Sequence, residues 1–74
     1  MNTVFNQNLL KAKIIERGTS VIAVCNELGI CEATFYRKLS RGGDFSRFEI
    51  VKIARFLDLS ATERDDIFFN RKLA

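Results

Sequence analysis

The chain has 74 residues, enough for one compact domain and too few for two, and a hydrophobic content of 47% with seven phenylalanines provides material for a single core. Twelve lysines and arginines against nine acidic residues give a net charge of +3, a mild overall bias toward anionic partners. No apolar run approaches the roughly 20 residues of a membrane-spanning helix, and no charged-then-apolar leader begins the chain. We therefore expect one soluble, cytoplasmic domain over residues 1–74 that makes no membrane contact.

Metal binding and catalysis are not expected from the side chains available. The chain has two cysteines and no histidine, so Cys25 and Cys31 could supply only two soft ligands, at a spacing unlike a zinc knuckle. We expect no metal site, no cofactor and two reduced thiols. An enzyme is also not expected, because there is no histidine, no glycine-rich phosphate loop and no close carboxylate pair in a predicted cleft.

Charge is distributed unevenly along the chain. Between residues 37 and 55 six cations stand against two anions, whereas between residues 58 and 66 four anions stand against one cation. A protein with one basic region and one acidic end would orient itself on a polyanion. An ordinary mixture of solvated surface charge explains the same pattern, so charge alone leaves both interpretations open.

The four glycines fall where helices would stop rather than inside them. The first helix is expected from about residue 6 or 8 to residue 17, with Leu10 and Ile14 four apart on one side. The second helix begins after a cap at Thr19 or Ser20 and ends before Gly29. It repeats apolar residues at the i, i+3, i+4 and i+7 positions of one face, namely Val21, Val24, Cys25 and Leu28.

The third predicted helix runs from about Glu32 to Ser40. Cys31 is a plausible first-turn residue, and Phe35 and Leu39 lie four apart on one side before two glycines release the chain. A cysteine thiol at a helix N-terminus would have a lowered pKa, but we do not expect it to be reactive.

Two capping boxes predict the fourth and fifth helices. In such a box, a serine side chain and a glutamate three residues later satisfy each other's backbone N–H groups. The boxes are Ser46 with Glu49 and Ser60 with Glu63, and the first precedes apolar residues at helical spacing, Ile50, Ile53, Ala54 and Leu57. The fifth helix should run toward residue 68 or 69 and leave residues 70–74 as a tail, and no segment shows the alternation of a strand. We therefore predict an all-α fold, a compact five-helix bundle.

The second and third helices are separated only by Gly29 and its neighbours, so the chain must turn sharply at a residue that tolerates positive φ. This spacing predicts a helix-turn-helix over about residues 20–40, in which the second helix can fit the major groove of duplex DNA. With Phe35 and Leu39 inward, one outer face of that helix collects Glu32, Ala33, Tyr36, Arg37 and Ser40.

These five side chains suit the reading of base edges. Arg37 can donate two hydrogen bonds to guanine, and Tyr36 and Ser40 can donate or accept. Ala33 can touch a thymine methyl group, and Glu32 could accept from cytosine N4. Any amphipathic helix shows a mixed polar face, so this helix alone does not distinguish a DNA-reading surface from an ordinary solvated one. The following loop and helix start favour DNA, because cations and backbone N–H groups gather there for phosphate, at Lys38, Arg41, Gly43 and Arg47.

The segment from residue 20 to 39 resembles the helix-turn-helix of the phage Cro and repressor family, at Ser20, Val24, Cys25, Leu28, Gly29, Ile30, Thr34, Phe35, Arg37 and Leu39. It is most similar to a subgroup of short regulators from phages of Gram-positive bacteria, which share Lys38-Leu39, Glu49-Ile50 and a Phe68-Phe69 pair. The similarity covers roughly residues 5–73. It implies a lambda-repressor-like five-helix fold that acts in the bacterial host cell and binds operator DNA, usually as a homodimer on two half-sites about one helical turn apart.

The resemblance also implies roles for single residues. Ser20, Arg41 and Arg47 would hold phosphates, and Cys25 would take a position where a small side chain lets two helices approach. Two departures weaken the expectation of tight DNA binding. The family often has a polar residue at the start of the second helix, where this chain has Val21 and Ile22, and Glu32 places an anion at the front of the recognition helix.

A second function stays open: a regulator of the same fold that acts as an antirepressor by binding another phage repressor. Exposed apolar residues mark partner surfaces, and the anchors would be Val21, Ile22, Tyr36 and Phe45. Ile22 projects roughly 110° from the inward side of its helix and should be exposed, whereas Val21 can be core. Phe68 and Phe69 project about 100° apart, so one should lie at a protein interface, unless both lie on the underside of the domain.

Overall fold

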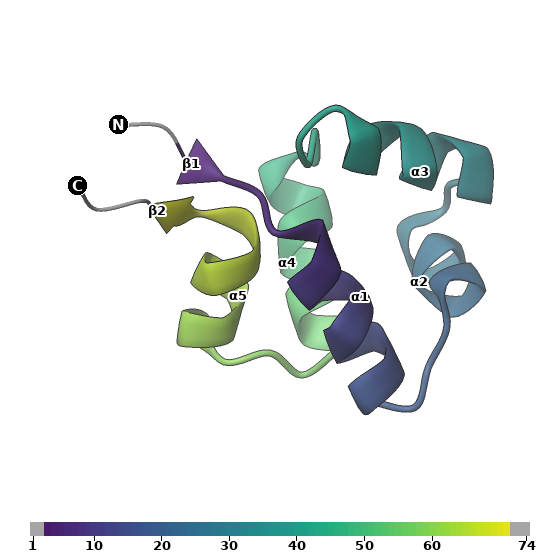
Figure 1. The fold of residues 1–74 in the computed structure, drawn as a ribbon. Coiled ribbons are helices and arrows are strands. Elements are labelled where there is room, and N and C mark those ends of the chain that lie inside the picture. The colour runs from purple at the N-terminus through teal and green to yellow at the C-terminus, as the bar shows by residue number, and fades with distance from the viewer. Residues whose placement is uncertain (1–2, 72–74) are drawn as a thin grey trace.

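The computed structural model describes residues 3–71 and the side chains of residues 5–69. Five helices make up most of it, and they confirm the predicted all-helical class. They are α1 (Gln7–Glu16), α2 (Val21–Leu28), α3 (Glu32–Ser40), α4 (Arg47–Phe56) and α5 (Ala61–Phe68), as Figure 1 shows. Within this part of the chain, no helix is both long and apolar enough to cross a membrane.

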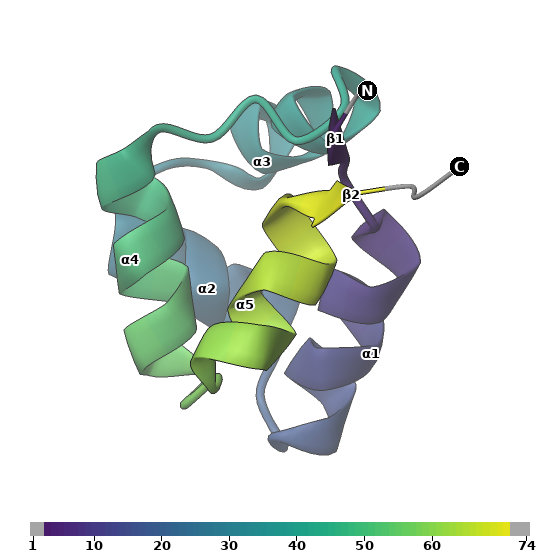
Figure 2. The ribbon, with the colours of Figure 1, turned by 90° about the vertical axis from the view of Figure 1, so that its left-hand side faces the viewer.

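Two very short strands close the fold, β1 (Thr3–Val4) and β2 (Asn70–Arg71). They pair antiparallel, with Thr3 opposite Arg71 and Val4 opposite Asn70. The expected tail is therefore wrong at residues 70 and 71, because two-residue strands are too short to show an alternating pattern. Residues 72–74 of that tail lie outside the described residues. The pairing brings the start and the end of the described chain together (Figures 1 and 2).

The helix starts follow from their capping residues. The Ser46 hydroxyl accepts from the backbone N–H of Glu49 at 3.1 Å, and the Glu49 carboxylate accepts from the N–H of Ser46 at 2.8 Å. Ser60 and Glu63 repeat the same box, so both predicted boxes are confirmed. Cys31 precedes α3 as its N-cap, without a side-chain cap bond, rather than lying in its first turn.

The α2 helix ends at Gly29, which has a φ of +72°. Side chains rarely adopt this left-handed conformation, which glycine adopts without strain. Its neighbour Ile30 donates its backbone N–H to the carbonyl of Cys25 at 3.0 Å, so the last turn of α2 is closed. The chain then enters α3 after two residues, which agrees with the short turn expected between the two helices.

The core lies where the five helices meet, and α2 packs mainly against α4. The radius of gyration of 11.7 Å is close to the roughly 11 Å expected for a compact chain of this length. The buried apolar residues come from every helix, from the loop before α4 and from the residue just after α4: Leu10, Ile14, Val24, Cys25, Phe35, Leu39, Phe45, Ile50, Ile53, Leu57, Ile67 and Phe68.

A cluster of four phenylalanine rings forms one end of this core. Phe45 lies at its centre, with ring centroids 6.0 Å from Phe5, 5.8 Å from Phe35 and 5.9 Å from Phe68. The prediction that Phe45 is a partner anchor is therefore wrong, because its ring is buried against the other aromatic side chains. Of the adjacent pair Phe68 and Phe69, Phe68 is buried in this cluster and Phe69 is 44% exposed, so only Phe69 is left as a candidate interface residue.

A set of ion pairs joins α1 to the start of α5. The Glu63 carboxylate accepts from Lys13 Nζ at 2.7 Å and lies 3.4 Å from a guanidinium nitrogen of Arg17. Arg17 also donates to the backbone carbonyl of Leu57 at 2.7 Å, just after α4. The hydrogen bonds from Lys13 and from the Ser60 N–H lower the pKa of Glu63 to about 2.

Candidate nucleic-acid interface

The α3 helix packs against the core through two side chains, and its other side is exposed to solvent. Phe35 is fully buried and Leu39 is 3% exposed. The residues opposite them are all exposed, and we call them the α3 outer face: Glu32, Ala33, Tyr36, Arg37 and Ser40. The predicted base-reading residues therefore lie together on the solvent-facing side of one helix, whose opposite side packs against the core.

The polar groups of the α3 outer face are largely available to a ligand. Within residues 5–69, no carboxylate or carbonyl accepts a hydrogen bond from the guanidinium of Arg37. The ring of Tyr36 meets Phe35 edge-on at 5.8 Å and is 46% exposed. The Ser40 hydroxyl donates to the carbonyl of Arg37 at 2.9 Å, so its oxygen can still accept.

The loop between α3 and α4 differs from the expectation of free backbone N–H groups. The N–H groups of Gly43 and Asp44 both donate to the carbonyl of Lys38, at 3.0 and 3.1 Å. Those of Arg41 and Gly42 donate to other carbonyls in the last turns of α3. The prediction that the backbone N–H groups of this loop bind phosphate is therefore wrong. These N–H groups already donate to the carbonyls that the end of a helix leaves unpaired.

Lys38 and Gly43, both predicted to contact phosphate, have roles inside the protein. The Lys38 ammonium donates to the carbonyl of Asp44 at 3.2 Å and lies 3.4 Å from a carboxylate oxygen of Glu49. Gly43 has a φ of +78°, and a Cβ there would overlap the ring of Phe5. Glycine at this position lets the N-terminal segment approach the loop, which the sequence alone did not indicate.

The other predicted phosphate contacts are exposed. Ser20 caps α2 by accepting from the N–H of Ala23 at 3.1 Å, and its own hydroxyl hydrogen remains free to donate. Arg41 ends α3 and Arg47 begins α4, and both side chains face solvent. At the start of α4 the capping box satisfies the N–H of Glu49. The N–H groups of the two helical residues before Glu49 have no acceptor within the helix, because the first N–H groups of any helix lack one, and they can therefore bind phosphate.

The two cysteines have different environments. Cys25 is buried, and burial raises the pKa of its thiol, in agreement with a packing role. The exposed Cys31 has a lowered pKa, as expected, but the main cause is its hydrogen bond with the hydroxyl of Thr34 at 3.3 Å. Among the described residues, no three side chains of the metal-binding types lie together.

No protein-family model, curated protein or solved structure matches this chain. The function of the exposed surface is therefore inferred from its own geometry and charge. Among the predicted protein-interface residues, Ile22 is 56% exposed and Phe69 is 44% exposed, whereas Val21 is half-buried against the core.

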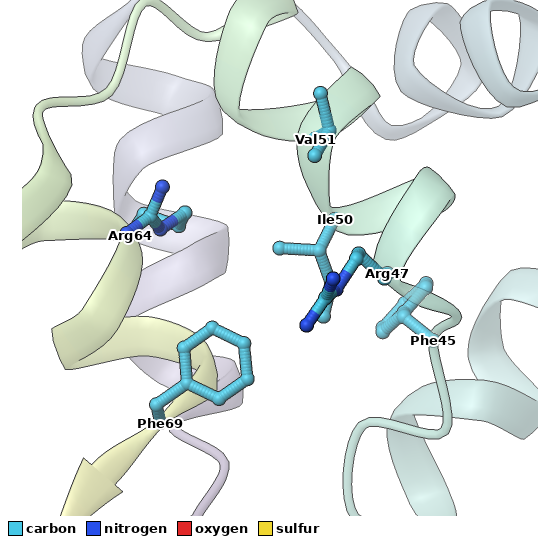
Figure 3. A pocket seen from close by; sticks show the side chains of 6 residues that line it. All are labelled: Phe45, Arg47, Ile50, Val51, Arg64 and Phe69. Atoms are coloured by element: carbon cyan, nitrogen blue, oxygen red, sulfur yellow. The ribbon is translucent and has the colours of Figure 1, made fainter.

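A hollow that the sequence did not predict lies between α4 and α5 (Figure 3). One residue in the sequence could have indicated this hollow. Val51 is apolar but does not belong to the i, i+3, i+4, i+7 series whose residues form the inner side of α4. Val51 is 40% exposed, and Phe69 lines the other side of the same hollow.

Proposed function

We propose that the chain is a sequence-specific DNA-binding transcriptional regulator, in which α2, the turn at Gly29 and α3 act as a helix-turn-helix. The observation that carries the proposal is the division of α3 into a buried side and the α3 outer face. A helix braced in this way can enter the major groove and present its outer side chains to base edges. Arg37 would then form two hydrogen bonds with one guanine, and Glu32 would accept from a cytosine amino group.

Phosphate contacts would orient α3 on the duplex. Arg41 and Arg47 flank the loop after α3, and both cations are exposed. Ser20 stands at the start of α2 and can donate its hydroxyl to phosphate. Contacts of this kind give affinity without sequence preference, and they weaken as salt rises because bound counterions are released. Two copies would bind two half-sites about one helical turn apart.

Selection from a random duplex DNA library tests this proposal. We expect one motif with paired half-sites to be enriched, and affinity for that motif to fall steeply between two salt concentrations. A matched duplex with the half-sites scrambled is the control. If no sequence is enriched, and binding to both duplexes is equally weak at low salt, direct sequence reading is excluded.

A second candidate function is favoured by the exposure of Ile22 at the start of α2. This aliphatic side chain is 56% exposed and offers nothing to a phosphate, but it could fill a pocket on another protein. Tyr36, also exposed, would extend the same contact. In this alternative the chain acts as an antirepressor that binds another repressor.

The substitution Ile22→Lys separates the two functions. If the chain binds DNA directly, the added cation should strengthen association with duplex DNA and steepen its salt dependence. If it binds a purified phage repressor instead, the same substitution should abolish that binding. The melting temperature should change little in either case, since the side chain is largely exposed. A large fall in melting temperature would contradict both.

A further inference from the structure

A groove runs between α4 and α5. Its wider part has a volume of about 470 Å³ and is lined by Phe45, Arg47, Ile50, Val51, Arg64 and Phe69. A second hollow of about 370 Å³ continues it along α4, and the two hollows share Val51 and Arg64. No residue of α2 or α3 lines either hollow, so the groove is a surface separate from the α3 outer face.

The groove has an apolar interior that is open to solvent. Ile50 projects from α4 into the space between the two helices, Val51 lies above it on α4, and the ring of Phe69 lies across from them at the end of α5 (Figure 3). Val51 and Phe69 keep 40% and 44% of their surface exposed, although they lie next to the core. A hollow of this volume can hold one or two large side chains, since ligand pockets commonly measure about 300 to 1,000 Å³.

Three arginines surround this interior: Arg47, Arg55 and Arg64. Asp58 is the one acidic residue among the described residues that line the two hollows. Within residues 5–69, neither Arg47 nor Arg55 forms an ion pair. Arg64 pairs with its neighbour Asp65 at 3.1 Å, but both side chains are well exposed, and such surface pairs contribute little. The arginines are therefore available to external carboxylates.

We propose that this groove binds an acidic amphipathic helix of a partner protein. One or two large apolar side chains of that helix enter between Val51 and Phe69, and carboxylates beside them pair with Arg47, Arg55 and Arg64. The ten residues of α4 extend for about 15 Å, the length of nearly three helical turns. A partner helix of that length places apolar residues at i, i+3 or i+4, and i+7 along the groove.

Charge and shape distinguish this occupant from two others. A symmetric contact between two copies of this chain would use the same patch twice, and would place the arginines of the two copies opposite one another. Nucleic acid would supply phosphates to the arginines, but it has no aliphatic side chain to fill the hollow. An acidic helix with apolar anchors matches both the interior and the rim.

Three synthetic helical peptides, each about three turns long, test the proposal. The first carries leucines at the anchor positions and glutamates beside them. The second replaces the glutamates with lysines, and the third replaces the leucines with serines. Fluorescence anisotropy with the full chain should show the first peptide binding at least about tenfold more tightly than either control. Equal binding of all three would overturn the proposal.

Substitutions in the groove locate the binding. Val51→Glu and Arg64→Glu should each weaken the acidic peptide at least about tenfold. Ile15→Glu should have no effect, because Ile15 is 76% exposed on α1 and lies outside the groove. Arg64→Glu should also bind the lysine peptide more tightly than the wild type does, a gain that unfolding cannot produce. An effect of Ile15→Glu as large as that of the groove variants would overturn the proposal.

Two further measurements separate the other occupants. Neither Val51 nor Arg64 belongs to the proposed DNA surface, so both groove variants should retain binding to the selected duplex. A loss of DNA binding in both would assign the groove to nucleic acid. Sedimentation should show the wild type and Val51→Glu in the same oligomeric state. A wild-type dimer that Val51→Glu dissociates would assign the groove to a second copy of the chain.

Discussion

Arg37 and Arg47 are both exposed cations, but they should contribute differently to DNA binding. Arg37 lies on the α3 outer face, where its guanidinium can form two parallel hydrogen bonds with one guanine. We predict that Arg37→Ala lowers affinity for the selected duplex by about 1 to 3 kcal/mol and relaxes the preference at one base pair. Competition binding against single-base variants of that duplex measures both effects.

Arg47→Ala is the matched variant on α4. Because a phosphate contact carries no sequence information, its loss should weaken selected and random duplexes by the same factor. It should also reduce the slope of log affinity against log salt by about one. If both arginine variants lose specific and random binding equally, the division between base reading and phosphate contact is wrong.

Gly43 is a residue whose replacement should cost more than its surface position suggests. Its φ is +78°, and an added Cβ would overlap both the ring and the Cβ of Phe5, so that whole side chain would have to move. We predict that Gly43→Ala lowers the free energy of unfolding by about 2 to 3 kcal/mol, as measured by urea unfolding.

Gly42→Ala is the control for backbone strain alone. Gly42 has nearly the same φ, +77°, and no atom of the described residues lies within 4 Å of an added Cβ, so its substitution should cost about 1 kcal/mol. The difference between the two variants measures the contact with Phe5. In a Phe5→Ala background that difference should largely vanish, and an unchanged difference would show that Phe5 is not the cause.

At the scale of the helix, the two capping boxes are the clearest local determinants. Ser46→Ala and Ser60→Ala each remove the acceptor for one backbone N–H group, so each should lower the free energy of unfolding by about 1 kcal/mol. Thr62→Ala, in the first turn of α5 but not at its cap, should change it by only a few tenths of a kcal/mol. Urea unfolding of the three variants checks the order.

The helices could be predicted because their signals are local. Gly29 ends α2 through its own backbone conformation, and Ser46 and Ser60 start α4 and α5 through partners three residues away. The exposure of the α3 outer face also follows from helical spacing once Phe35 and Leu39 are assigned to the core. These features depend on neighbours within one or two helical turns.

The features that the sequence did not predict depend on contacts between distant segments. Phe45 is buried because Phe5 and Phe68, from opposite ends of the chain, cover it. The pairing of β1 with β2 similarly joins residues 3–4 to residues 70–71. Residue spacing along one helix carries no information about such contacts.

Across the whole molecule, Glu63 of α5 connects three helices, since Lys13 comes from α1, Arg17 caps the end of α1, and Arg17 also reaches the end of α4. The folded state lowers the pKa of this carboxyl from 4.5 to about 2. Its contribution to stability is therefore fully present above about pH 4.5 and is lost as the pH falls toward 2. We predict that the melting temperature falls over this interval.

Glu63→Gln isolates this carboxyl from the others that titrate in acid. The difference in melting temperature between the wild type and this variant should be largest above pH 4.5 and should shrink as the pH approaches 2. Asp66→Asn, at an exposed residue of α5, is the control and should follow the wild type. A Glu63→Gln difference that stays constant with pH would show that the ion pairs do not shift the titration of Glu63.

The aromatic composition of the chain has a spectroscopic consequence. Tyr36 is its one tyrosine and there is no tryptophan. Excitation at wavelengths longer than those that phenylalanine absorbs therefore produces emission from the ring of Tyr36. That ring lies half-exposed on the α3 outer face and does not line the groove between α4 and α5. A ligand that covers α3 should alter the emission of the unlabelled protein, while a peptide held between α4 and α5 should leave it unchanged.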